Sequence, residues 1–235
     1  MAPANLDFGR SFTFTTEDPD WLKKILIGGA FALACSVLVG VPFVLGYTAR
    51  TLRRAAAGSY APLPEWDDLG GIFREGLRLT AVYLLHMLGV AAVAMLFVGF
   101  LLLPALLSGG RRHPMEALGP LGALLFVALY GLILVVALAT AVYLPAAMVR
   151  AALADSVAAG FEWRQNVEFI RANLANYALA LVSYLVAGFV AQFGVLLCCV
   201  GLFPAAFWSY LVLAVALGQT VRLAASPSLA ASPSL

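Results

Sequence analysis

Charged side chains are scarce in this sequence. Only 11% of its 235 residues are Asp, Glu, Lys or Arg, whereas 63% are hydrophobic. Soluble domains carry about a quarter charged residues, so this chain could not cover a water-facing surface with polar groups. The net charge of +2 is small, and no arginine-rich stripe is present, so nucleic acid is not an expected partner. The composition therefore predicts an all-α membrane protein whose first partner is the lipid bilayer.

Histidine and cysteine are also scarce, which argues against most catalytic and metal sites. Two histidines cannot supply a multi-His metal site, and a His-based hydrolase is equally disfavoured. Cys35, Cys198 and Cys199 lie in apolar runs and lack the spacing of a disulfide framework or a zinc site. Phosphate-loop, His-Glu-x-x-His and Gly-x-Ser-x-Gly motifs are missing. We therefore expect no enzymatic activity, no catalytic residue and no bound metal ion.

Long apolar runs, by contrast, are abundant. Residues 1–24 form a polar segment without the features of a cleaved signal. A helix that crosses about 30 Å of hydrocarbon needs about 20 residues. The runs at 25–49, 79–107 and 117–149 are long enough, and the run at 177–218 is long enough for two spans joined near Gly201 and Pro204. We expect about five transmembrane helices in one membrane domain over residues 25–222, followed by a Ser/Pro-rich low-complexity tail at 223–235.

The distribution of Lys and Arg predicts the orientation of these spans. With five spans, nine of the 14 basic residues lie in the loops 50–78 and 150–173 or at Arg222, and five lie on the other face. The positive-inside rule then places both loops in the cytoplasm and the N-terminus outside. An alternative remains open, in which Gly40 and Pro42 break the first run into a re-entrant hairpin. That arrangement leaves four spans and puts both termini inside.

Two stretches of the chain are similar to each other. PEWDDLGGIFREGL (residues 64–77) aligns without gaps with FEWRQNVEFIRANL (residues 161–174). Both place apolar residues at helical spacing after a Glu-Trp pair, so each predicts an amphipathic helix at the membrane surface. We interpret the chain as a parallel tandem repeat, with repeat 1 over about 25–107, repeat 2 over about 117–203 and a final span over about 204–221.

Several residues are candidates for contacts with lipid or with other helices. Trp21, Trp66 and Trp163 are expected to anchor the chain at the membrane interface. The first apolar run also carries small residues at four-residue spacing, which let another helix approach closely, either from the second repeat or from a separate subunit. These helix-packing positions are Gly28, Ala32, Ser36 and Gly40.

Two polar side chains lie inside the predicted spans. His86 is expected to bond a neighbouring helix through Tyr83, Ser183 or Gln192, and a less favoured alternative is an axial ligand to haem or to the magnesium of chlorophyll. Gln192 is expected to bond between helices. The sequence requires no cofactor.

The chain resembles a family of prokaryotic integral membrane proteins catalogued as domain of unknown function 4013. The residues that carry the resemblance are Asp20-Trp21, Gly28-Gly29, Gly46-Tyr47, Arg50, Arg53 and the segment LPEWDD at 63–68. The resemblance covers most of the chain and implies a polytopic helical protein of a prokaryotic cytoplasmic membrane. It implies no activity, cofactor or catalytic residue.

The sequence favours a non-enzymatic scaffold or accessory subunit of a larger membrane complex, for example a bioenergetic one, with other membrane protein subunits as partners. The alternative is a transporter or channel for a small solute or an ion. Its site would be built from helices interrupted at Pro42 and Pro145.

Overall fold

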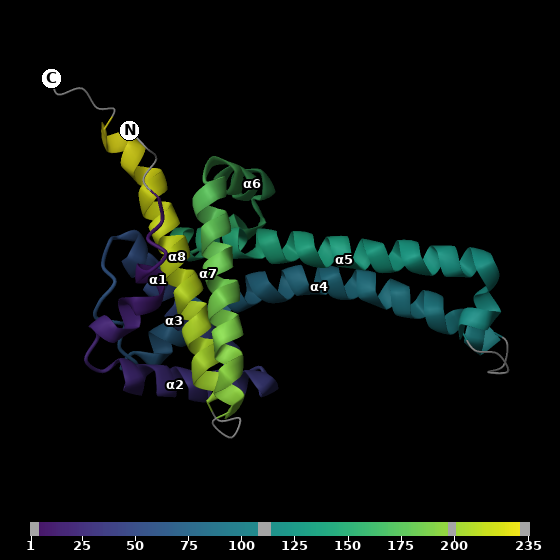
Figure 1. Cartoon of the computed structure of the whole chain (residues 1–235), viewed down its shortest axis with the longest axis horizontal. Helices are drawn as coiled ribbons and strands as arrows, with labels where there is room; N and C mark the ends of the chain where they lie inside the picture. Colours follow the sequence, from purple (N-terminus) through teal and green to yellow (C-terminus); the bar gives the residue numbers. More distant parts are fainter. Residues whose placement is uncertain (1–4, 108–113, 197–200, 231–235) are drawn as a thin grey trace. The chain divides into compact units, whose positions relative to one another are not determined.

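The protein is all-α, as predicted. The computed structural model describes residues 5–107, 114–196 and 201–230. Within these ranges the regular elements are eight α-helices and four short 3-10 helices (Figure 1). The α-helices are α1 Arg10–Thr13, α2 Trp21–Ala34, α3 Val41–Ala56, α4 Leu69–Leu107, α5 Pro114–Ala154, α6 Trp163–Ala172, α7 Leu174–Gln192 and α8 Leu202–Ala230. The 3-10 helices are η1 Phe14–Glu17, η2 Cys35–Val37, η3 Ala158–Phe161 and η4 Phe193–Leu196.

The chain divides into two compact units. The first comprises Met1–Val82 and Ala146–Leu235, and the second comprises Tyr83–Pro145. The second unit therefore contains most of α4 and α5, while the other helices belong to the first. The boundaries predicted for one membrane domain and its tail stay a prediction, although α8 continues as a helix to Ala230, well past the predicted start of the tail.

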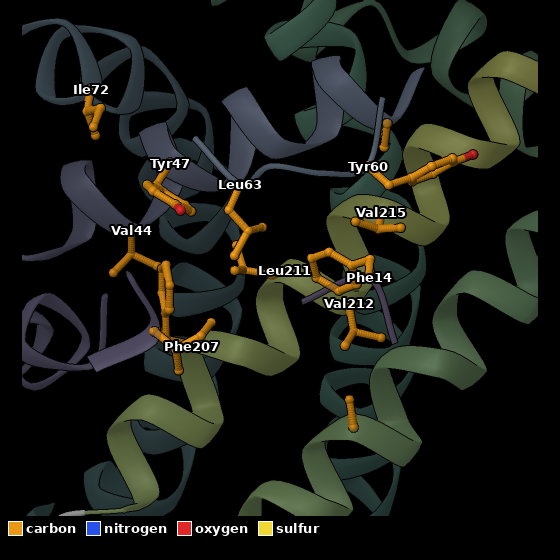
Figure 2. Packing of buried hydrophobic residues seen from close by; sticks show 13 residues of the cluster. Phe14, Val44, Tyr47, Tyr60, Leu63, Ile72, Phe207, Leu211, Val212 and Val215 are labelled. Carbon is orange, nitrogen blue, oxygen red and sulfur yellow. The ribbon is translucent and has the colours of Figure 1, made fainter. Parts of the chain in front are cut away.

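The central helix of the first unit is α8. It lies beside α7, and α2 and α3 also pack against it (Figure 1). Phe207, Leu211 and Val215 of α8 are fully buried and meet Tyr47 of α3 and Phe14 of the N-terminal segment (Figure 2). A fully buried aromatic or aliphatic side chain contributes about 1.5–3 kcal/mol. This shared core therefore holds residues from both ends of the chain together.

Two glycines let the backbones of α3 and α4 cross at very short range. A Cβ atom at Gly76 would overlap the carbonyl oxygen of Pro42, and one at Gly46 would overlap the carbonyl oxygen of Ile72. Only a residue without a Cβ fits at either position without moving a backbone. The crossing fixes the start of α4 against α3.

Within the described ranges, four helices are long and apolar enough to cross a membrane, where the sequence predicted about five. The candidate spans are Leu69–Phe100, Gly122–Ala154, Leu174–Leu196 and Leu202–Ala225. The predicted span at 25–49 is divided instead, because α2 ends at Ala34 and α3 begins at Val41. Leu38 in the break has a left-handed backbone with φ +65°. Pro42 cannot donate in a helix interior but fits the first turn of a new one, which explains the restart.

The two predicted surface helices have different outcomes. The second is confirmed as a separate helix, α6, which Asn173 divides from α7 with a non-helical φ of −120° and a side-chain hydrogen bond of 2.9 Å to the carbonyl of Phe169. Its position at the membrane surface stays a prediction. The first is wrong, because α4 begins only at Leu69, after Trp66, and continues into the span. Gly76, the residue aligned with Asn173, lies inside continuous helix. The tandem repeat stays a prediction.

The second unit is an α4–α5 hairpin. Phe97 of α4 stacks near Phe126 and Tyr130 of α5, with ring centroids 5.4 and 6.4 Å apart. Pro145, the last residue of this unit, lies within α5 and does not end the helix. In the most apolar 18-residue stretch of α4 only 6% of the residues are buried, and in that of α5 none is. In the corresponding stretch of α8 the share is 56%. Very few residues of these two spans are therefore buried within the chain.

We predict that Gly76→Ala destabilises the protein by about 3 kcal/mol, because the added methyl group forces α3 and α4 apart. Gly70→Ala, in the same helix, is the matched control because a Cβ there meets open space. Thermal unfolding of the purified protein in detergent measures both. Equal melting temperatures for the two variants would contradict the close crossing.

Candidate functional site

The most densely bonded polar cluster of the first unit surrounds Lys24. Its ammonium group donates to Asp18 Oδ2 at 2.8 Å, to the carbonyl oxygen of Leu63 at 3.1 Å and to Glu65 Oε1 at 2.5 Å. The side chains of Lys24 and Asp18 are only 4% and 1% exposed. The three donors of the ammonium group are all engaged, so Lys24 is held protonated and cannot act as a base or a nucleophile.

Asp18 completes the cluster from the N-terminal segment. Its Oδ2 also accepts the backbone N–H of Leu63 at 2.6 Å, and its Oδ1 accepts the N–H of Asp20 at 2.8 Å. A buried carboxylate needs such donors, since an unpaired charge in this position costs several kcal/mol. The cluster therefore ties residues 18–20, the first turns of α2 and the 61–66 loop to one another.

An aromatic stack lies beside this cluster. Trp66 stacks on Tyr47 and on Phe31 with centroid distances of 4.3 and 5.1 Å, and its Nε1 donates to the carbonyl of Lys24 at 3.1 Å. The Tyr47 hydroxyl donates to the carbonyl of Pro64 at 2.7 Å. Burial raises the pKa of Tyr47, and the nearby acids Asp18 and Glu65 add to this effect. The hydroxyl is thus a permanent donor that fixes the loop.

The pKa values of the buried pair are shifted in opposite directions. Burial by itself would raise the pKa of Asp18, but the hydrogen bonds from Lys24 and two backbone N–H groups bring it below the ordinary 3.8. Burial would likewise lower the pKa of Lys24, but the bonds to Asp18 and Glu65 bring it above 10.5. Both groups are therefore charged over the whole physiological range.

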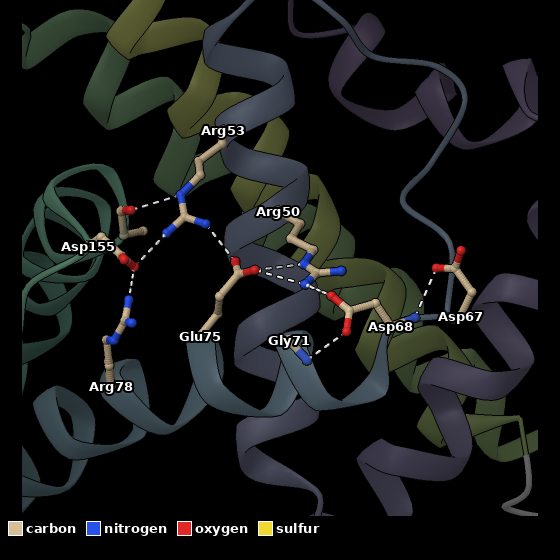
Figure 3. Close-up of polar contacts among 9 residues, drawn as sticks. Arg50, Arg53, Asp67, Asp68, Gly71, Glu75, Arg78 and Asp155 are labelled. Atoms are coloured by element: carbon tan, nitrogen blue, oxygen red, sulfur yellow. Dashed lines mark hydrogen bonds and ion pairs between the residues drawn. The ribbon is translucent and has the colours of Figure 1, made fainter.

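A second polar cluster joins α3, the start of α4 and the end of α5 (Figure 3). Glu75 is 2.9 Å from Arg50 and 2.5 Å from Arg53, and Asp155 pairs with Arg53 at 3.3 Å and also with Arg78. Arg50 reaches Asp68 at 2.7 Å, and Arg53 donates to the carbonyl of Ala152 at 2.9 Å. Three arginines thus meet three carboxylates, and the charges cancel. This balance favours a structural clamp over a site for a charged ligand.

The three predicted anchor tryptophans lie in different surroundings. Trp163, at the start of α6, is 63% exposed, with the Arg164 guanidinium 5.4 Å from its ring centroid. Trp21, at the start of α2, is 37% exposed. Trp66 is half-buried in the aromatic stack described above. Anchoring at the membrane interface stays a prediction for all three residues, but Trp66 also has a clear role in packing.

The two predicted intramembrane polar residues belong to different units. His86 is half-buried in the second unit, with its ring centroid 5.5 Å from that of Tyr143. Gln192 is the last residue of α7 in the first unit and its side chain is exposed. Ser183, a suggested partner of His86, donates to the carbonyl of Leu179 within its own helix at 2.9 Å. A cofactor role for His86 stays a prediction.

The predicted ridge of small residues is divided between elements. Gly28 and Ala32 lie on α2, where a Cβ at Gly28 would overlap the ring of Phe207. Ser36 falls in η2 and Gly40 precedes α3, so neither continues the face. The close approach at Gly28 is therefore made by α8 of the same chain.

The profile of one protein family matches residues 29–200, and the family is described as a protein of unknown function, DUF4013. The chain belongs to this family. No curated protein and no solved structure matches it. Membership confirms the resemblance seen in the sequence and, together with four candidate spans, supports a multi-pass membrane protein. The family profile includes Leu63 and Glu65 but begins after Asp18 and Lys24.

Sequence reasoning missed the Lys24 cluster. In the sequence Lys24 directly precedes the apolar run at 25–49, and a lysine so close to such a run needs a buried partner or a path to water. Its partners Leu63 and Glu65 are 39 and 41 residues away. The local pattern therefore signalled the need for a partner but not its identity.

We predict that Lys24→Met destabilises the protein by about 3–5 kcal/mol, because it leaves the buried Asp18 carboxylate without its counter-charge. Adding Asp18→Asn to Lys24→Met should recover part of the loss. Lys23→Met, at the exposed neighbouring position, is the control and should change stability by less than about 0.5 kcal/mol. Thermal melts in detergent measure the series, and equal effects at positions 23 and 24 would rule out the cluster.

The cluster also predicts a pH dependence. Because the folded pKa of Asp18 is depressed, its contribution is present above the unfolded value near 3.8 and is lost as pH falls through the folded pKa. The stability difference between wild type and Asp18→Asn should therefore shrink on acidification below about pH 4 and stay constant near neutrality. Melts of both proteins from pH 3 to 8 measure it, and a constant difference throughout would contradict the assignment.

Proposed function

We propose that this protein is a non-enzymatic integral membrane protein that acts as a scaffold or accessory subunit of a larger membrane assembly. We place it in a prokaryotic cytoplasmic membrane, with the segments 50–78 and 150–173 on the cytoplasmic side. Other membrane protein subunits would be its partners.

The observation that carries this proposal is the exposed second unit. In the most apolar stretch of each of its two helices, at most 6% of the residues are buried within the chain. Gly89 and Gly99 of α4 and Gly131 of α5 all leave open space where a Cβ would point. In lipid, close packing at small residues drives helices together more than hydrophobicity does. The hairpin therefore offers positions where a helix of another subunit could approach closely.

The polar clusters of the first unit support the same proposal. Lys24 donates to three oxygen acceptors, and Arg50, Arg53 and Arg78 are paired with carboxylates. Groups used in this way hold a shape and do not present a reactive atom. They fit a unit that positions a membrane hairpin.

A transporter or channel is the second candidate, favoured by one observation. The break between α2 and α3 at residues 35–40 resembles the interrupted helices that form substrate sites in transporters. The predicted interruption at Pro145 is not seen, since α5 continues through it. Solute or ion flux into liposomes containing the purified protein would favour this candidate.

We predict that gentle extraction from native membranes yields a complex with at least one other membrane protein, detected by native mass spectrometry. Gly89→Leu or Gly131→Leu should lower the yield of the partner by roughly tenfold, because a large side chain keeps the partner helix away. Met95→Leu, at an exposed position of the same hairpin, is the control and should retain the partner. A preparation that contains the chain alone, with measurable flux, would reject the scaffold proposal.

A further inference from the structure

We propose that α2 and α3 form a re-entrant hairpin, which enters and leaves the bilayer on the face that carries both ends of the chain and contacts lipid acyl chains through its apolar turn. The proposal concerns the topology and the lipid contact of the first apolar run. It does not depend on the scaffold function.

The segments that precede and follow the hairpin both contact the same end of α8. Before α2, the Asp7 N–H donates to Gln219 Oε1 at 2.9 Å, and Gln219 Nε2 donates to Ser11 Oγ at 3.1 Å. After α3, the Tyr60 ring lies 5.6 Å from the guanidinium carbon of Arg222. The chain therefore leaves the end of α8 near residues 219–222 and comes back to it within about 50 residues.

The turn of the hairpin lies toward the opposite end of α8. A Cβ at Gly29 of α2 would meet Pro204, which precedes Gln219 by 15 residues, or about 22 Å of helix. On the return, Val44 of α3 shares the core with Phe207, and Ala55 adjoins Gly218. α3 thus runs parallel to α8, and the whole run adds no net crossing of the membrane.

The turn is apolar and exposed. Leu33, Val37, Leu38 and Val39 are 51%, 68%, 67% and 62% exposed. No charged residue occurs between Ile25 and Ala49. Transfer of such aliphatic side chains from water into an apolar environment is favourable. Lipid acyl chains are the occupant whose chemistry matches this surface.

The basic residues agree with this topology. If the first run adds no crossing, 12 of the 14 Lys and Arg residues fall on one face, and by chain order only Arg111 and Arg112 fall on the other. The five-span arrangement divides the same residues nine to five. Because the positive-inside bias is far stronger with four spans, the face that carries both termini is the cytoplasmic one.

The lipid contact is tested with single cysteines in a full-length background in which Cys35, Cys198 and Cys199 are replaced by Ala. A polarity-sensitive fluorophore at Val39→Cys should shift to the blue and lose roughly half of its fluorescence to a quencher carried on lipid acyl chains. The same label at Ser59→Cys, an exposed loop position near the C-terminal end of α8, should be unaffected. Leu33→Cys is a second probe of the apolar surface. Labels at 33 and 39 that behave like the label at 59 overturn the lipid contact.

The topology is tested separately with reporters fused to each end of the full chain. A fluorescent protein that matures only in the cytoplasm should give signal at both ends. Alkaline phosphatase, active only outside, should be inactive at both. Opposite results at the two ends would mean that the first run crosses the membrane, and they would overturn the proposal even if the turn contacts lipid.

Discussion

The buried pair of Lys24 and Asp18 is the constraint on which the first unit depends. Charges removed from water must be paired and fully hydrogen-bonded, so each group of the pair dictates where its neighbours lie. Asp18 accepts the N–H of Leu63, while Lys24 donates to Leu63 and Glu65. The 61–66 loop is thereby drawn against α2, and Trp66 is placed in its aromatic stack. The sequence predicted that residues 64–77 form a helix at the membrane surface, but Leu63 and Trp66 of this loop belong to the core of the first unit.

The contact between α3 and α4 likewise determines the partners of the arginines of α3. Gly46 and Gly76 allow two backbones to cross where no side chain fits, and this contact sets the position of Glu75 opposite Arg50 and Arg53. Close packing and ion pairing therefore reinforce each other. The result is a unit in which these charged groups stabilise the fold.

The two units differ in the share of their apolar residues that is buried within the chain. The first buries a shared aromatic and aliphatic core around α8, whereas the second has two long apolar helices in whose spans very few residues are buried. A protein of this kind needs lipid, a partner subunit or both around its hairpin. The re-entrant arrangement of α2 and α3 would add a further lipid contact on the cytoplasmic side and leave both termini there.

The sequence alone determined what depends on composition and local periodicity. Its scarcity of charge predicted a helical membrane protein, and the spacing after Glu162 correctly predicted α6. It failed where contacts between distant residues compete with local pattern. The run at 25–49 is apolar enough for a span, yet it is divided near Gly40 and Pro42 into α2 and α3. Both of these helices pack against α8. Trp66 had the pattern of a surface anchor, but the partners that surround it come from α2, α3 and α8. Only the tertiary structure could decide how the 25–49 run divides and where Trp66 packs, because the partners of a buried charge or ring can lie far from it in the sequence.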